Sequence, residues 1–248
     1  MKRTLLLPLL CLSVLTFAQE PGSADGSGGP AKKGLEASLG FSLHSNGIAP
    51  IPSFSLDKPA LAVEASVARG RFSYDPALFY SLDMKPWFID NWFHYRIVDR
   101  EVFDLTAGIN FSTFCAGMSV DGEEILKAER YFAGSLSATW QLGAKSFLTA
   151  DYWSDNGQEK GTVSGHFLAL AYDLSDLALG AKGLLSFHFL AFYINYTGNN
   201  DGLFLSPSAT LTGRDLPVSL FLQATQPLQT NIDPSPGFKW NVGIRYDM

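Results

Sequence analysis

From about residue 34 onward, apolar and polar residues alternate along the chain with a period of two. Between Leu35 and Leu43, every second residue is Leu, Ala or Phe, and the intervening residues are Glu, Ser and Gly. The segments 103–112, 203–212 and 240–248 repeat this alternation. Successive side chains of a strand point to opposite faces, so this period predicts strands with one apolar and one polar face. The mature chain lacks a convincing helical period, and the sequence therefore predicts an all-β fold.

Twelve strands are predicted from this alternation, at 34–44, 60–68, 71–82, 91–98, 102–113, 129–140, 145–154, 163–174, 184–196, 202–212, 217–225 and 238–248. Most are close to the length of about nine to eleven residues that crosses a bilayer at a tilt. The fourth and ninth strands are weakly patterned, which leaves ten or fourteen strands as alternatives.

The predicted connections alternate between short and long. Short ones fall at 69–70, 99–101, 141–144, 174–183 and 213–216, and long ones at 45–59, 83–90, 114–128, 155–162, 197–201 and 226–237. An up-and-down barrel with short turns at one end and longer loops at the other has this rhythm. We therefore predict one domain over 34–248, a closed antiparallel transmembrane β-barrel. A soluble secreted β-sandwich that binds a ligand or partner is the alternative architecture.

Composition agrees with a membrane barrel. Charged residues make up 17% of the chain, aromatic residues 13%, and the mean hydropathy of +0.07 is too low for a bundle of membrane helices. In a barrel, lipid-facing and lumen-facing residues alternate and cancel in such an average. We expect interfacial aromatic girdles from the rings near predicted strand ends, namely Tyr80, Trp87, Trp92, Trp140, Tyr152, Trp153, Tyr193, Tyr196 and Trp240.

The N-terminus has the features of a secretory signal peptide. Lys2 and Arg3 precede the apolar run from Leu5 to Phe17, and Ala18 offers a small residue at the cleavage site. We predict a signal peptide at 1–18 and a flexible Gly, Ser and Pro-rich periplasmic leader at 19–33. The formal net charge of −6 becomes about −8 when Lys2 and Arg3 are removed, so nucleic acid is not an expected partner.

The last strand carries a candidate signal for barrel assembly. Asn241, Gly243, Tyr246 and Met248 resemble the C-terminal pattern that ends on an aromatic and a terminal apolar residue, although Phe is the usual last residue. The expected location is the bacterial outer membrane. The expected partners are outer-membrane lipid and the export and barrel-assembly machinery.

Several short segments resemble a known family. They are Pro52-Ser53-Phe54 with Lys58-Pro59, Arg71-Phe72-Ser73, Lys85-Pro86-Trp87 with Trp92, Arg130-Tyr131-Phe132, Asp201-Gly202 and Lys239-Trp240-Asn241-Val242. In this order they resemble an uncharacterised family of outer-membrane β-barrel proteins from Bacteroidetes, over roughly residues 40–248. The resemblance implies the fold and the location, and it implies no activity.

The predicted lumen face carries charges of both signs. Candidate pore-lining residues are Glu64, Arg71, Asp75, Arg96, Asp104 and Arg245, and further polar positions are Glu36, His94, Asp151, Asp173, Lys239 and Asp247. One interpretation is a narrow water-filled channel for small solutes, with Arg71, Arg96 and Arg245 along its wall. The other is a plugged structural barrel in which these charges pair with one another.

A membrane-embedded esterase is the enzymatic alternative. His44-Ser45-Asn46-Gly47 is similar to the His-x-Ser-Asn-Gly motif of outer-membrane phospholipase A, but the spacer is missing. Adjacent residues of a strand point to opposite faces, so we favour a strand end followed by a turn and expect no catalytic residues.

Other segments predict no metal or cofactor site, because the acidic stretches 121–129 and 151–159 lack the ligand spacing of a calcium loop. The Pro-rich segment 49–59 either folds inward as a constriction or lies over the mouth of the barrel.

Overall fold

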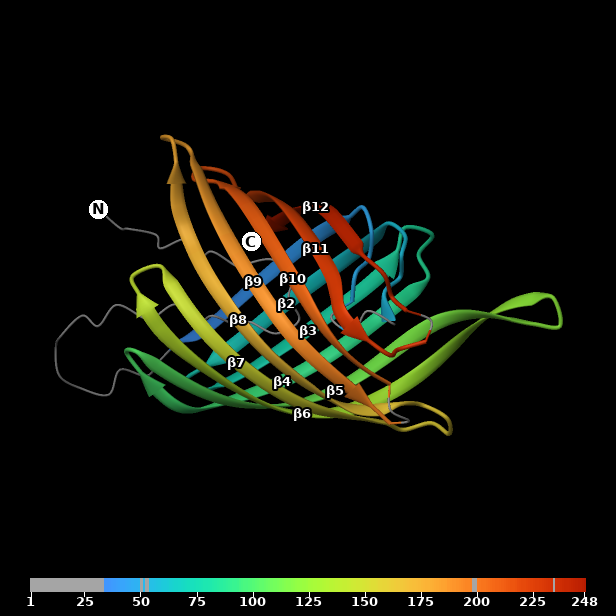
Figure 1. Cartoon of the computed structure of the whole chain (residues 1–248). Coiled ribbons are helices and arrows are strands. Elements are labelled where there is room, and N and C mark those ends of the chain that lie inside the picture. The colour runs from blue at the N-terminus through green and yellow to red at the C-terminus, as the bar shows by residue number, and fades with distance from the viewer. Residues whose placement is uncertain (1–33, 50, 52–53, 198–199, 234) are drawn as a thin grey trace.

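The computed structural model describes residues 34–49, 51, 54–197, 200–233 and 235–248. The predicted signal peptide (1–18) and leader (19–33) lie outside the described residues. Within the described part of the chain, twelve strands form one closed antiparallel barrel (Figure 1). They are β1 (Leu35–His44), β2 (Ala60–Arg69), β3 (Phe72–Ser81), β4 (Pro86–Arg100), β5 (Phe103–Val120), β6 (Glu123–Gly143), β7 (Ser146–Gly157), β8 (Ser164–Leu179), β9 (Gly183–Tyr196), β10 (Asn200–Gly213), β11 (Val218–Thr230) and β12 (Lys239–Asp247).

Each strand pairs with its neighbours in sequence, and β12 closes the barrel by pairing with β1. Leu39 and Met248 exchange backbone hydrogen bonds, so the first and last strands meet at one end of the barrel. This is also the end of the short connections such as 70–71 and 101–102, and we call it the turn end. The opposite end, which carries the segment 45–59, is the loop end. The all-β prediction and the strand number of twelve are confirmed.

The prediction of a loop at 114–128 is wrong. β5 and β6 continue as a paired hairpin as far as Val120 and Glu123, and this hairpin projects well beyond the barrel (Figure 1). The two connecting residues are Asp121 and Gly122, with φ angles of 53° and 84°. An Asp-Gly pair with two positive φ angles is typical of the tight turn that joins antiparallel strands.

Three other strand ends differ from the prediction by five residues, and one of them is the end of β11, which continues to Thr230 instead of residue 225. β4 begins at Pro86 instead of residue 91, so the connection from β3 is short. β8 continues to Leu179 through a register shift between Leu174 and Leu177, which replaces most of the predicted 174–183 connection by strand. The register shift interrupts the alternation of apolar and polar residues in β8. The predicted strand therefore ends earlier than the observed one.

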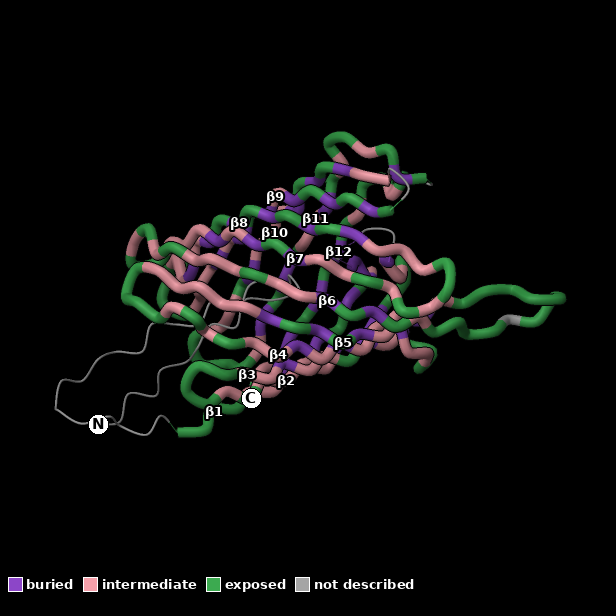
Figure 2. Tube along the Cα trace, turned by 90° about the horizontal axis from the view of Figure 1, so that it is seen from below, coloured by how far each residue is buried: buried purple, intermediate pink, exposed green. Residues whose placement is uncertain are grey.

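Buried and exposed positions alternate along the strands (Figure 2). On β8, Phe167, Ala169 and Ala171 are buried inside the barrel, whereas Leu168 and Leu170 are exposed on its outer surface. The outer surface of the other strands is similarly apolar, with exposed Ile109, Phe111, Phe132, Leu136, Phe189, Leu203, Leu205, Leu220, Leu222, Val242 and Ile244. The exterior therefore has the apolar character of a surface in contact with lipid hydrocarbon.

The aromatic girdle prediction is wrong for four residues. Trp140, Tyr152, Tyr193 and Trp240 do lie exposed on the exterior, but four other rings are buried inside the barrel: Trp87, Trp92, Trp153 and Tyr196. Strand parity explains Trp92, Trp153 and Tyr196, which stand an even number of residues from other interior positions. Trp87 is out of this parity, because it lies at the register shift between β3 and β4. These interior rings form part of the candidate site.

Candidate functional site

The interior of the barrel has an aromatic region towards the loop end. Phe204, Phe192, Phe167 and Trp153 come from the consecutive strands β10, β9, β8 and β7. Their rings stack in series, with centroid distances of 5.0 Å, 5.2 Å and 4.2 Å. All four side chains are buried, so this part of the interior packs like a protein core.

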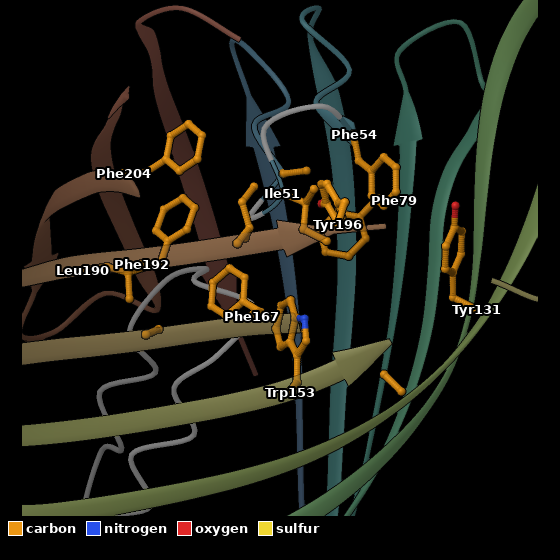
Figure 3. Close-up of a cluster of buried hydrophobic side chains, with 14 of the residues drawn as sticks. Ile51, Phe54, Phe79, Tyr131, Trp153, Phe167, Leu190, Phe192, Tyr196 and Phe204 are labelled. Atoms are coloured by element: carbon orange, nitrogen blue, oxygen red, sulfur yellow. The ribbon is translucent and has the colours of Figure 1, made fainter. Parts of the chain in front are cut away.

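A segment of the first long connection folds into this region. Ile48, Ala49, Ile51 and Phe54 are all buried, at 5–9% exposure, although they belong to no strand. Figure 3 shows Ile51 and Phe54 among the rings of the barrel wall. We call these four residues, Ile48, Ala49, Ile51 and Phe54, the inner segment. Of the two alternatives for 49–59, the inward one holds for Ala49, Ile51 and Phe54, whereas 57–59 are exposed.

Hydrogen bonds and ring contacts hold the inner segment in place. Trp87 Nε1 donates to the Phe54 carbonyl oxygen at 2.8 Å, and the Phe54 ring stacks on Phe114 with centroids 4.5 Å apart. At the base of the segment, Gly47 N donates to Lys58 O at 2.9 Å, and Leu56 N donates to Gly47 O at 2.8 Å. The segment is thus tied to itself at its base and to the barrel wall at its tip.

Two cavities lie along the wall formed by β3 to β7. The first, which we call the chamber, has a volume of about 70 Å³ and lies between the inner segment and the wall. The second, the vestibule, has a volume of about 100 Å³ and lies towards the turn end. Trp92 lines both cavities, and its ring stacks on His94 with centroids 5.3 Å apart. Trp92 therefore stands between the two spaces.

The chamber combines aromatic walls with acidic groups. Besides the inner segment, its lining contains Phe79, Trp87, Phe88, Trp92, Tyr131 and Trp153, together with Asp90, Asp155, Asn110 and Ser112. Asp90 is buried and accepts a long hydrogen bond of 3.4 Å from Asn110 Nδ2. Asp155 Oδ1 accepts the backbone N–H of Gly165 at 2.8 Å. Asp90 and Asp155 are not among the predicted site residues, although both have the strand parity of interior residues.

Of the six predicted pore-lining residues, Arg71, Arg96 and Asp104 line the vestibule. Arg96 Nη1 lies 3.3 Å from Asp99 Oδ1, while Arg71 is exposed at a turn and donates to the Ile97 carbonyl oxygen at 3.1 Å. The guanidinium groups of Arg71 and Arg96 are therefore held near the turn end, away from the chamber.

The other three predicted pore-lining residues, Glu64, Asp75 and Arg245, form contacts with other side chains inside the barrel. Arg245 is buried at 2% exposure, where it pairs with Glu64 and donates from Nε to Asp247 Oδ1 at 2.7 Å. Because Gly40 has no Cβ, the guanidinium fits over β1 and links β12 to β2. Asp75 accepts hydrogen bonds from Ser66 Oγ at 2.5 Å and Ser73 Oγ at 2.8 Å, and it contacts His94 Nδ1 at 2.8 Å.

His44 contacts Ser42 and not Ser45. Asn241 Oδ1 accepts the backbone N–H of Asn46 at 3.1 Å, which fixes the orientation of the Asn241 amide. Asn241 Nδ2 must then donate to His44 Nδ1, 2.9 Å away. The proton of His44 is consequently on Nε2, which donates to Ser42 Oγ at 2.9 Å.

This tautomer is the opposite of the one a hydrolase needs, because a general base accepts the serine proton on Nε2. Ser45 Oγ instead accepts the backbone N–H of Val242 at 2.9 Å and fastens β1 to β12. The geometry gives no support to an esterase built on His44 and Ser45.

The predicted assembly residues face both sides of β12. Tyr246 and Met248 are exposed, whereas Asn241 and Gly243 are buried in the interior.

In the described part of the chain, no group of three or more His, Cys, Asp or Glu side chains is arranged to hold a metal ion. Among the same residues, no helix has the length and apolar character that crossing a bilayer requires.

No protein-family model matches the sequence, and the search of curated proteins gives no match. The resemblance to the Bacteroidetes family is therefore not confirmed. Among solved structures, the KdgM porin and its complex with disordered oligogalacturonate each align with a TM-score of 0.56 and 9% identity, over 84% of this chain and 98% of theirs. An outer-membrane channel from Pseudomonas putida F1 aligns with a TM-score of 0.49 and 9% identity, over 90% of this chain and 99% of its own. The fold of this chain is that of an outer-membrane β-barrel.

Proposed function

We propose that this protein is a channel of the bacterial outer membrane that admits small solutes through a lumen narrowed by its own inner segment. The burial of Ile48, Ala49, Ile51 and Phe54 inside the barrel carries the proposal. A segment that only connected two strands would leave these residues at the mouth. Their position across the lumen is that of a constriction.

The exterior and the closed topology support the membrane location. A closed barrel pairs its backbone groups between strands, as hydrocarbon requires. The apolar outer surface provides contact with lipid, and the likeness to the KdgM porin adds the fold of a known outer-membrane protein. Outer-membrane lipid and the export and barrel-assembly machinery are accordingly the partners we propose.

The size of the interior spaces sets the class of solute. The chamber and the vestibule, of about 70 Å³ and 100 Å³, hold a few water molecules or part of a small organic molecule. The Trp92 ring lies between them, so passage requires movement of this ring or of the inner segment. The channel should therefore conduct small solutes slowly and exclude oligomers.

Swelling of proteoliposomes in solutes of graded size tests this function. The wild-type protein should admit only the smallest solutes, and Phe54→Ala should raise both the rate and the size limit. Phe238→Ala is the matched control, because Phe238 is exposed in the connection between β11 and β12. Heat-shifted gel mobility confirms that each variant is folded.

A plugged structural barrel is the second candidate, favoured by the burial of the rings around the inner segment. It predicts no swelling for the wild type or for Phe54→Ala, although both proteins fold. That result would overturn the channel proposal.

A further inference from the structure

The chamber contains two carboxylates that face aromatic rings. Asp90 lies on β4 and Asp155 on β7, and both line the same cavity as Phe88, Tyr131 and Trp153. Asp90 is 5% exposed, and Asn110 is the partner that donates to it. A carboxylate in such surroundings has lost most of its hydration and gains strongly from a nearby cation.

Neither carboxylate forms an ion pair with a Lys or Arg of the described chain. The buried Arg245 is already paired with Glu64 and Asp247, and Arg96 lies beside Asp99 near the turn end. Lys239 at the loop end is paired with Asp57. None of these three cations lines the chamber. The chamber itself presents carboxylate oxygens and ring faces.

An independent observation concerns Trp92, which lines both the chamber and the vestibule. Trp92 is buried at 9% exposure, and its indole Nε1–H has no hydrogen-bond partner among the described residues. Buried donors in proteins are nearly always paired, so an unpaired one at a cavity wall indicates an acceptor supplied by a bound molecule or water. Trp92 lines the same cavity as Asp90 and Asp155.

The Phe54 ring shows that an aromatic group fits this site. It lies 4.5 Å from Phe114, 5.7 Å from Tyr131 and 6.4 Å from Phe88, measured between ring centroids. Phe54 belongs to the inner segment, which is not part of the barrel sheet, so its ring enters the chamber from a connection between strands. A free molecule with a similar ring would make the same ring contacts in place of the Phe54 side chain.

We propose that the chamber binds small aromatic cations, with the ring of the ligand in the place of the Phe54 ring and its ammonium group beside Asp90 or Asp155, the two carboxylates that line the chamber. The surrounding rings add cation–π attraction. A hydroxyl group on the ligand would accept the Trp92 N–H. This inference rests on the proposed function, since it names the class of solute that enters the lumen.

Binding of three matched probes to the detergent-folded protein tests this inference. Tyramine carries an ammonium group, 4-ethylphenol is neutral, and 4-hydroxyphenylacetate is an anion with the same ring. Tryptophan fluorescence and calorimetry should show tyramine binding at least tenfold more tightly than the other two. Phe54→Ala should strengthen tyramine binding, because it vacates the ring site.

Two substitutions test the role of charge. Asp90→Asn combined with Asp155→Asn should weaken tyramine binding at least tenfold and leave 4-ethylphenol unchanged. Asp83→Asn is the control, because Asp83 lies in an exposed connection at the loop end, and it should change nothing. If the double variant does not fold, the comparison of the three probes on the wild type and on Phe54→Ala still decides.

Equal affinities for the three probes, or no binding to either the wild type or Phe54→Ala, would overturn the proposal. Swelling measured on the same preparation separates the two conclusions. Swelling without preference for the cation refutes the ligand class alone. Cation binding without swelling would refute the channel proposal and support the proposed binding site.

Discussion

Gly243 lies at the seam where β12 closes the barrel on β1. The seam contains five residue pairs, from Gly40 with Asp247 to His44 with Gly243, whereas β1 and β2 share ten. A Cβ atom on Gly243 would lie 2.4 Å from the Leu43 carbonyl oxygen and 2.1 Å from Phe221 Cζ. The Phe221 ring is able to rotate, but the Leu43 carbonyl belongs to the paired backbone. Gly243→Ala should therefore push the two strands of the shortest seam apart.

The expected cost is that of overpacking a filled interior, about 1–3 kcal/mol, or roughly a 5- to 150-fold change in the unfolding equilibrium. The assay is urea-induced unfolding of the purified protein in detergent micelles, followed by heat-shifted gel mobility and tryptophan fluorescence. Gly134→Ala is the matched control, because a Cβ at Gly134 on β6 meets no heavy atom within 4 Å.

The same assay separates structure from assembly, since Gly243 also belongs to the predicted C-terminal signal. A residue whose only role is recognition by the assembly machinery would not affect stability in micelles, because the machinery is absent there. Equal stability of Gly243→Ala and Gly134→Ala in micelles would refute the packing argument.

Three further variants test the contacts around the lumen. Trp87→Phe removes the donor to the Phe54 carbonyl, worth about 1 kcal/mol, and should raise chymotryptic cleavage after Phe54 about fivefold; unchanged cleavage would contradict the anchoring role. Arg245→Ala leaves Glu64 without its cation and should lower the stability in urea by about 3 kcal/mol, whereas Arg71→Ala at an exposed turn should change it by less than about 0.5 kcal/mol. Hydrolysis of a p-nitrophenyl ester should be the same for the wild type, Ser42→Ala and Ser45→Ala, and a loss in either variant would revive the esterase alternative.

The barrel itself was predictable because its period follows from backbone geometry. On β1 and β12, alternate residues must face lipid and lumen, and the sequence shows this directly. The projecting hairpin was missed despite a clear signal, since the Asp121-Gly122 pair specifies a tight turn between two strands.

The candidate site was predictable only in part. Strand parity places Trp92 and Asp90 in the interior, and it also places Ser42 on the same face as His44, so these relations were available from the sequence. The contact of Phe54 with Phe114 and Tyr131 was not, because it depends on how a connection packs against strands that follow much later in the chain. The pairing of Arg245 with Glu64 likewise requires knowledge of the barrel closure.

Single-channel conductance in a planar bilayer tests the central claim most directly, by comparing the wild type with the double variant Ile51→Ala, Phe54→Ala. If the inner segment narrows the lumen, the wild type should give small, reproducible steps, and the double variant should give steps several times larger. Phe238→Ala should behave as the wild type. Identical steps in the wild type and the double variant, or none from either folded protein, would contradict the account.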